Sequence, residues 1–184
     1  MTDDLDGTLE DIAAHLDAAG IPYMVVGSIA AAMHGRARST MDVDIVIEPT
    51  AASLKAFVER LPDAAYYVSP EAAVDALKRR SQFNVLDLRS GWKVDLMIRK
   101  ARPFSIEEFA RRSARTSFGR TVVVASIEDV IVAKLEWARM GSSERQLEDC
   151  RALVGLAAAG LDVAYVERQV AALGVEAEWA RVRA

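Results

Sequence analysis

Residues 23–44 read YMVVGSIAAAMHGRARSTMDVD, and this stretch decides the fold. Four apolar residues, 23–26, predict a short strand, and Gly27-Ser28 ends that strand and begins an alanine-rich helix. The alternation of acidic and apolar residues in 42–48 (DVDIVIE) predicts a second strand. The chain therefore runs from a strand through a Gly-Ser turn into a helix, and then into a strand that opens with two acids.

Three acids on two predicted strands form the candidate catalytic site. Asp42 and Asp44 project to one face, because residues i and i+2 of a strand share a face, and Asp95 stands between Val94 and Leu96 in a later apolar strand. Carboxylates this close repel each other unless a cation lies between them. Oxygen ligands suit Mg²⁺, which also recruits phosphates and water. We therefore expect Asp42, Asp44 and Asp95 to be catalytic and to hold two metal ions.

The Gly-Ser turn is the candidate phosphate site. A strand that turns at Gly27 into a helix beginning at Ser28 presents backbone N–H groups and the positive end of the helix dipole to an anion. Arg38 could reach a phosphate, and Thr40, two residues before Asp42, could share its strand face. We expect Gly27, Ser28, Arg38 and Thr40 to bind a nucleotide.

The remaining pattern mixes helices with strands and then becomes entirely helical. We expect helices at 5–19, 51–61, 70–80 and 105–114, a hairpin of strands 83–88 and 93–98, a strand at 121–124, and helices from 127 to the end with breaks near 141–143, 160 and 174. This predicts an α/β (α+β) fold, with a small mixed sheet and flanking helices in a core over 1–125. A helical C-terminal part over 126–184 follows and packs with the core as one unit, because no Pro/Ser-rich linker separates them.

Composition sets the broad class. The chain has 184 residues, 52% of them apolar, which is enough for a sizeable core. One cysteine, Cys150, cannot form an internal disulfide, and no Cys/His cluster indicates zinc. The acidic N-terminus does not resemble a signal peptide, and no apolar stretch is long enough to span a bilayer. We expect a cytoplasmic protein with no membrane partner.

Charge is unevenly distributed along the chain. The net charge is −4, but residues 78–120 hold twelve Lys and Arg against four Asp and Glu. This basic block is either a set of solvated helix faces or a surface that meets a polyanion such as RNA.

The order of the turn and the three acids resembles the nucleotidyltransferase superfamily related to DNA polymerase beta, over roughly residues 20–100. The resemblance implies transfer of a nucleoside monophosphate from a nucleoside triphosphate to a hydroxyl, with release of pyrophosphate. It implies that Asp42 and Asp44 bind two Mg²⁺ ions, for which Mn²⁺ could substitute. It also implies that Asp95 binds the catalytic ion and helps to deprotonate the acceptor, while Gly27 and Ser28 hold the triphosphate.

A second stretch resembles a narrower group. Residues 126–135 (SIEDVIVAKL) followed by 145–149 (RQLED) are similar to the helical part of AbiEii-type toxins of bacterial toxin–antitoxin systems, including mycobacterial toxins that target tRNA. The resemblance implies that Lys134 contacts the triphosphate and that Asp149 lies at the edge of the site. The alternative is a structural ion pair of Lys134 with Asp149 or Glu128, because a lysine in an apolar helix face needs a partner.

Three functions follow. The first is a toxin that modifies the 3′ end of tRNA and has a cognate antitoxin, which suits the basic block. The second is an antibiotic nucleotidyltransferase for aminoglycosides or lincosamides, because the acidic remainder of the chain could receive a cationic acceptor. The third is a nucleotide-binding module without catalysis.

Overall fold

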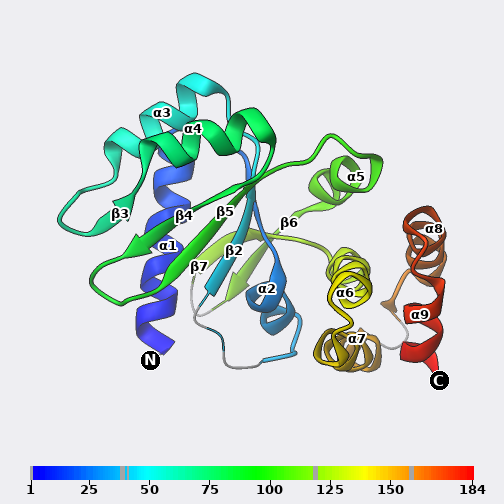
Figure 1. The fold of residues 1–184 in the computed structure, drawn as a ribbon. Coiled ribbons are helices and arrows are strands. Elements are labelled where there is room, and N and C mark those ends of the chain that lie inside the picture. Colours follow the sequence, from blue (N-terminus) through cyan, green and yellow to red (C-terminus); the bar gives the residue numbers. More distant parts are fainter. Residues whose placement is uncertain (1, 38–39, 41, 118–119, 158–159) are drawn as a thin grey trace.

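A seven-stranded mixed sheet forms the centre of the molecule (Figure 1). The computed structural model describes residues 2–37, 40, 42–117, 120–157 and 160–184. The strand order is β3-β4-β5-β2-β1-β7-β6. The strands are β1 (Tyr23–Val25), β2 (Asp42–Ile47), β3 (Tyr66–Val68), β4 (Gln82–Asp87), β5 (Lys93–Ile98), β6 (Ser113–Ser117) and β7 (Arg120–Val124). The central pair, β2 and β5, is parallel, and β1 pairs antiparallel with β2.

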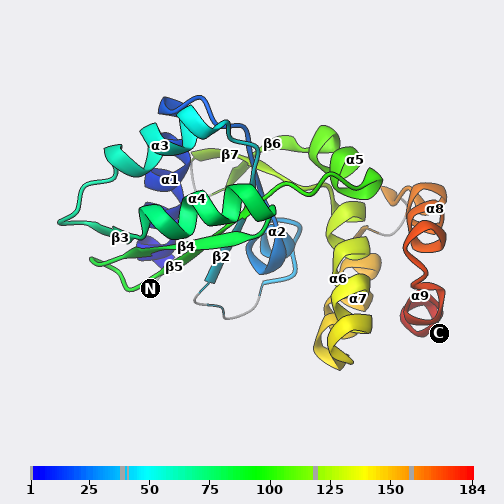
Figure 2. The same cartoon turned by 45° about the horizontal axis from the view of Figure 1, so that its top comes forward.

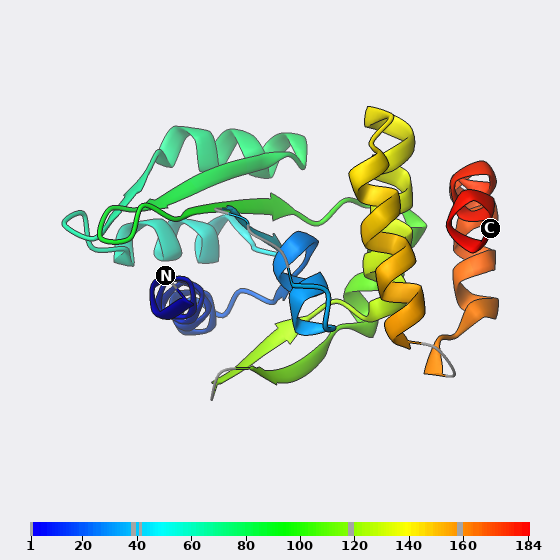
Figure 3. The same ribbon diagram turned by 90° about the horizontal axis from the view of Figure 1, so that it is seen from below.

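Helices pack against the sheet and beyond one end of it. They are α1 (Thr2–Ala18), α2 (Gly27–Met33), α3 (Ala51–Arg60), α4 (Pro70–Arg79), α5 (Pro103–Arg111), α6 (Ile127–Gly141), α7 (Glu144–Ala157), α8 (Val163–Leu173) and α9 (Glu176–Arg183). Helix α4 contacts β4 and β5, while α1 contacts α3. Helices α6 to α9 lie together to one side of the sheet (Figure 2). Helix α2 lies between the sheet and this helical group (Figure 3) and contacts α6.

The pleat of β2 separates the core from the site. Val43, Ile45 and Ile47 are fully buried, because they point to the helix-covered face. Asp42 and Asp44 alternate with them and therefore point to the opposite face. The same alternation that builds the core thus delivers two acids to the other side of the sheet.

The expected fold class is confirmed as a mixed α/β structure. The expected elements occur close to their expected bounds, and Thr50 caps α3 by accepting a hydrogen bond from the backbone of Ser53 (3.1 Å). The division at residue 125 stays a prediction. Among the described residues, no helix is long and apolar enough to cross a membrane.

Two strands at the edges of the sheet were not predicted. β3 has three residues, too few for an alternation to show. β6 reads SARTS, whose polar side chains carry no apolar period. The expectation of a helix over 105–114 was therefore wrong at its end, because Ser113 and Ala114 pair with β7 instead. Pairing with a neighbouring strand fixes such segments more strongly than their own sequence does.

Candidate active site

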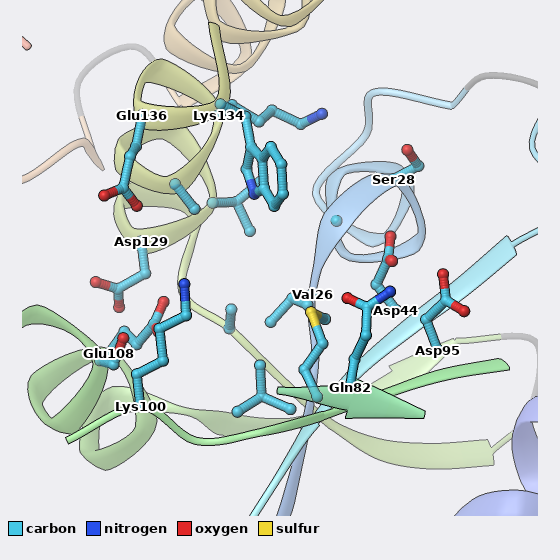
Figure 4. A pocket seen from close by; sticks show the side chains of 18 of the residues that line it. Val26, Ser28, Asp44, Gln82, Asp95, Lys100, Glu108, Asp129, Lys134 and Glu136 are labelled. Carbon is cyan, nitrogen blue, oxygen red and sulfur yellow. The ribbon is translucent and has the colours of Figure 1, made fainter. Parts of the chain in front are cut away.

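The parallel register of β2 and β5 places Asp44 directly opposite Asp95. Asp42 stands opposite Lys93 in the same register. Residues two apart in a strand share a face, so these four side chains occupy one patch of the sheet. Figure 4 shows Asp44 and Asp95 side by side at one end of a pocket. The structure therefore brings Asp42, Asp44 and Asp95, the expected carboxylate cluster, to one place.

Burial and the neighbouring carboxylates make Asp44 harder to ionise than an ordinary aspartate. Burial, together with the charges of Asp95 and Asp42, raises the pKa of Asp44 to about 6, although the charges of Lys93 and Lys134 oppose the change. A carboxylate in this position is costly to ionise without a nearby cation.

A lysine lies inside the cluster. The Nζ of Lys93 is 3.1 Å from Oδ1 of Asp42 and 3.1 Å from Oδ2 of Asp95. Hydrogen bonds to these two carboxylates raise the pKa of Lys93. Sequence reasoning missed this residue, although its place two positions before Asp95 in a strand already puts both on one face.

The donor set suits a hard divalent cation. The oxygens of Asp42, Asp44 and Asp95 are the ligand type that Mg²⁺ prefers. Oδ1 of Asp95 is buried and accepts no hydrogen bond from any described residue, and a buried carboxylate oxygen of this kind is costly unless it finds a partner. In the described part of the chain, however, no three His, Cys, Asp or Glu side chains are already arranged to hold a metal ion.

The Gly-Ser turn lies against the carboxylates. The backbone N–H of Val26 donates to the carbonyl of Asp44 (2.9 Å), and Gly27 then turns with a φ of +63°. Ser28 is buried and lines the cleft above Asp44 (Figure 4). Val26 precedes α2 and cannot cap it with its side chain. The positive end of α2 therefore lies beside the carboxylate cluster, where an anion bound with a cation would be favoured.

Arg38 and Thr40, which precede Asp42 in the chain, were expected to bind the nucleotide. The backbone N–H of Asp42 donates to Oγ1 of Thr40 (3.3 Å), so Thr40 holds the start of β2. Thr40 also lines the cleft. Arg38 lies outside the described residues. A nucleotide-binding role for either residue stays a prediction.

Lys134 has partners already. Its Nζ is 2.8 Å from Oδ2 of Asp149 and 3.0 Å from Oε1 of Gln146, and both charged side chains are at most 5% exposed. Asp149 also pairs with Arg36 at 3.2 Å. Lys134 lines the same cleft as Ser28 and extends from α6 toward it (Figure 4). The structural ion pair is therefore present, and Lys134 lines the same cleft as the Gly27-Ser28 turn.

The cleft extends from the carboxylates to a second group of acids. It has a volume of about 630 Å³ and passes between the sheet and α5 to α7. Glu108, Asp129 and Glu136 line its far end (Figure 4), and we call them the acidic wall. Two of the three are ion-paired, because Glu136 pairs with Arg102 and Asp129 pairs with Arg111.

Glu108 is the remaining member of the acidic wall. Burial, the largest cause, and the charge of Asp129 together raise the pKa of Glu108 to about 7. Arg102 and a hydrogen bond from Ser105 act in the opposite direction. Sequence reasoning did not single out Glu108, because a single Glu in an amphipathic helix is ordinary.

Two apolar side chains of α6 remain exposed in the cleft. Trp137 is 57% exposed and Met140 is 67% exposed, and both line it. They lie three and six residues after Lys134, so the helical period places them along one side of α6. This spacing was the signal that sequence reasoning overlooked.

The basic block is not a uniform surface. At least six of its twelve cations form ion pairs with carboxylates of this chain: Arg79, Arg89, Lys93, Arg99, Arg102 and Arg111. Their charge is thus offset within the fold.

Comparison of this fold with solved structures finds proteins that share it. The antibiotic-resistance factor ANT(2″)-Ia matches with a TM-score of 0.63 and 16% identity, over 100% of this chain and 97% of that one. The same protein in complex with adenylyl-2″-tobramycin matches with 0.61 and 20% identity, over 96% and 99%. The lincosamide antibiotic adenylyltransferase LnuA, lincomycin-bound, matches with 0.55 and 14% identity, over 85% and 98%.

A fourth structure matches to a similar degree. The antigenic nucleotidyltransferase-like protein from Paracoccidioides brasiliensis has a TM-score of 0.61 and 18% identity, over 93% of this chain and 87% of that one. No family model matches the sequence, and no curated protein matches it either. At these identities the likeness concerns the backbone, and it shows that this chain has the nucleotidyltransferase fold.

Proposed function

We propose that this protein is a magnesium-dependent nucleotidyltransferase that moves a nucleoside monophosphate from a nucleoside triphosphate to an acceptor hydroxyl. One observation carries the proposal. Asp44 and Asp95 stand opposite each other on parallel strands, and Gly27, at the start of α2, is in contact with Asp44. A carboxylate cluster beside a helix N-terminus is a place where a cation and a polyphosphate bind together.

Each side chain has a defined task in this proposal. Asp42, Asp44 and Asp95 would hold the metal, which supplies charge neutralisation of the triphosphate and activation of the attacking hydroxyl. The backbone at Gly27 and Ser28 receives the phosphates. Lys134 and its neighbours in α6 line the cleft from the other side.

The cleft favours a small acceptor. Its volume of about 630 Å³ lies within the range for small-molecule sites. The acidic wall stands at the end opposite the carboxylate cluster, and an amine of the acceptor placed beside Glu108 would favour the ionised carboxylate. We infer that the acceptor carries both a hydroxyl and an amine, as aminoglycosides do. Two of the proteins with this fold, seen in three structures, bear the names of antibiotic-modifying or antibiotic-resistance proteins.

Among the possible acceptors, the sequence pattern favoured RNA, as in a tRNA-directed toxin that has a cognate antitoxin. That function needs an open basic surface that leads to the carboxylates. The ion pairs of Arg89, Arg99 and Arg102 with Asp11, Glu48 and Glu136 offset part of the charge on which it relied. A tRNA acceptor therefore stays a prediction of lower rank, which the same assay tests.

The test is a transfer assay with defined acceptors. The protein is incubated with each α-labelled nucleoside triphosphate, Mg²⁺ or Mn²⁺, and an aminoglycoside, a lincosamide or bulk tRNA. We expect label on the aminoglycoside. Asp44→Asn should reduce the rate by at least about 1000-fold, because the metal supplies several kcal/mol of transition-state stabilisation. Asp63→Asn, an exposed acid outside the cleft, is the matched control and should keep the rate.

The outcomes separate the acceptors. Label on tRNA alone would support the toxin function and overturn the small-molecule acceptor. Nucleotide binding without transfer to any acceptor would leave a binding module. No binding of any nucleotide, with or without Mg²⁺, would overturn the proposed function altogether.

A further inference from the structure

Lys93 occupies the space between two of the three acids that the proposed function assigns to a metal. Its Nζ is equidistant from Asp42 and Asp95, at 3.1 Å from an oxygen of each. The register explains this position, because Lys93 is paired with Asp42 across the strands and lies two residues before Asp95 along β5. The lysine is thus fixed beside the acids by the sheet itself and does not reach them from a distant loop.

The net negative charge of the carboxylate cluster is smaller than that of the three acids alone. Asp42, Asp44 and Asp95 bring three negative charges, and the ammonium of Lys93 removes one. A divalent ion between Asp42 and Asp95 and the ammonium in the same place are incompatible, because two cations in contact repel each other strongly. Oδ1 of Asp95 remains buried and accepts no hydrogen bond from the described residues. The lysine therefore neutralises the cluster only in part.

The contacts of Lys93 can be broken at low cost. Its side chain is 40% exposed, that of Asp42 is 51% exposed and that of Asp95 is 12% exposed. Because water competes for the ammonium in both contacts, these ion pairs contribute less free energy than fully buried ones. The four-carbon stem of lysine also lets the ammonium move while the backbone of β5 stays in place. A structural ion pair meant to persist would be expected to be as buried as that of Lys134 and Asp149.

We propose that Lys93 is an internal, displaceable counter-cation that competes with the divalent metal ion for Asp42 and Asp95. The inference rests on the proposed metal site. In the metal-free protein the ammonium holds the two carboxylates together. When a metal ion binds, the ammonium moves outward into solvent. The competition lowers the affinity of the protein for metal alone, so that tight metal binding requires the charge of the triphosphate as well.

The experiment measures metal binding without any reaction. Metal-free full-length protein is titrated with Mn²⁺ in the absence of nucleotide, and free Mn²⁺ is followed by electron paramagnetic resonance. Lys93→Met should bind Mn²⁺ roughly three- to tenfold more tightly than the wild type, because two partly exposed ion pairs no longer have to be broken. Lys93→Gln is measured as well, so that the result does not depend on one variant folding.

Two controls isolate the charge at this position. Lys93→Arg keeps the charge and should keep the wild-type affinity. Lys55→Met removes an exposed, ion-paired lysine of α3 and should change nothing. Equal or weaker binding by Lys93→Met and Lys93→Gln would overturn the inference while leaving the metal site intact. Absence of Mn²⁺ binding in every protein would instead overturn the metal site of the proposed function.

Discussion

A β-carbon added to Gly27 would lie 2.1 Å from Oδ2 of Asp44 and 2.9 Å from its Cγ. The contact joins the turn that begins α2 to the carboxylate on β2. Gly27 also has a φ of +63°, which side chains disfavour. Two independent reasons therefore require glycine here, and both concern the geometry of the candidate site.

Gly27→Ala should disable the site. Alanine costs about 1–2 kcal/mol in a left-handed conformation, and the clash with Asp44 adds about 1–3 kcal/mol or displaces that carboxylate. We expect transfer activity to fall at least about 100-fold, as small misplacements at a reacting centre do. Gly20→Ala is the matched control, because Gly20 has a φ of +64° and open space around it. Urea unfolding of both variants separates the clash from the cost of the left-handed backbone, which the two share. If Gly20→Ala lost as much stability and activity as Gly27→Ala, a clash with Asp44 would be contradicted.

Lys134 is predicted to serve both stability and binding. Lys134→Met should lower the free energy of unfolding by about 3 kcal/mol, because it takes a buried cation away from the buried carboxylate of Asp149, which also pairs with Arg36. The double variant Lys134→Met/Asp149→Leu should recover most of that loss, since two apolar groups replace the pair. It should still bind nucleoside triphosphate about tenfold more weakly or worse, as measured by calorimetry. Recovery of nucleotide binding together with stability would reduce the pair to a structural role.

The sequence predicted that Asp42, Asp44 and Asp95 would lie together, because local patterns encode their positions on β2 and β5. Alternation along 42–48 shows which side of the strand carries the acids, and an isolated acid such as Asp95 in an apolar strand stands out. Their meeting depended on a single further condition, that β5 lies next to β2, and the sheet meets it.

What the sequence could not predict depends on contacts between distant segments. The acidic wall brings Glu108 of α5 next to residues of α6 such as Glu136. The spacing of residues within one helix cannot predict that side chains of two different helices meet. The basic block looked like a surface because ion partners such as Asp11, Glu48 and Glu136 lie far from it in the chain. Pairing across the fold decides whether a charge is available to a ligand.

Glu108 should make stability depend on pH. Its pKa is about 7 in the folded state against 4.5 for an ordinary glutamate, so folding binds a proton and stability falls as pH rises from about 4.5 to about 7. Glu108→Gln cannot ionise, and without an acceptor it should be more stable than the wild type by about 3 kcal/mol above pH 7. The difference should disappear below about pH 4.

Urea unfolding between pH 4 and 8.5 tests this, with the exposed Glu59→Gln as a control that stays within about 0.5 kcal/mol at every pH. A difference that does not vary with pH would refute the buried, protonatable state of Glu108.

Trp137 should contribute to binding without contributing to stability. Its side chain is 57% exposed and lines the cleft. Removing this side chain therefore takes little buried apolar area away from the folded protein. A planar base or ring in the cleft would cover it, and stacking of this kind contributes about 1–3 kcal/mol. Trp137→Ala should therefore weaken binding of the substrate nucleotide about 5- to 100-fold by calorimetry, while the free energy of unfolding changes by less than about 0.5 kcal/mol. Trp137→Phe should keep most of the affinity, because a planar ring remains. Tyr67→Ala removes an aromatic side chain that is 64% exposed on edge strand β3 and should leave binding unchanged. Unaltered nucleotide affinity in Trp137→Ala would show that the nucleobase lies elsewhere in the cleft.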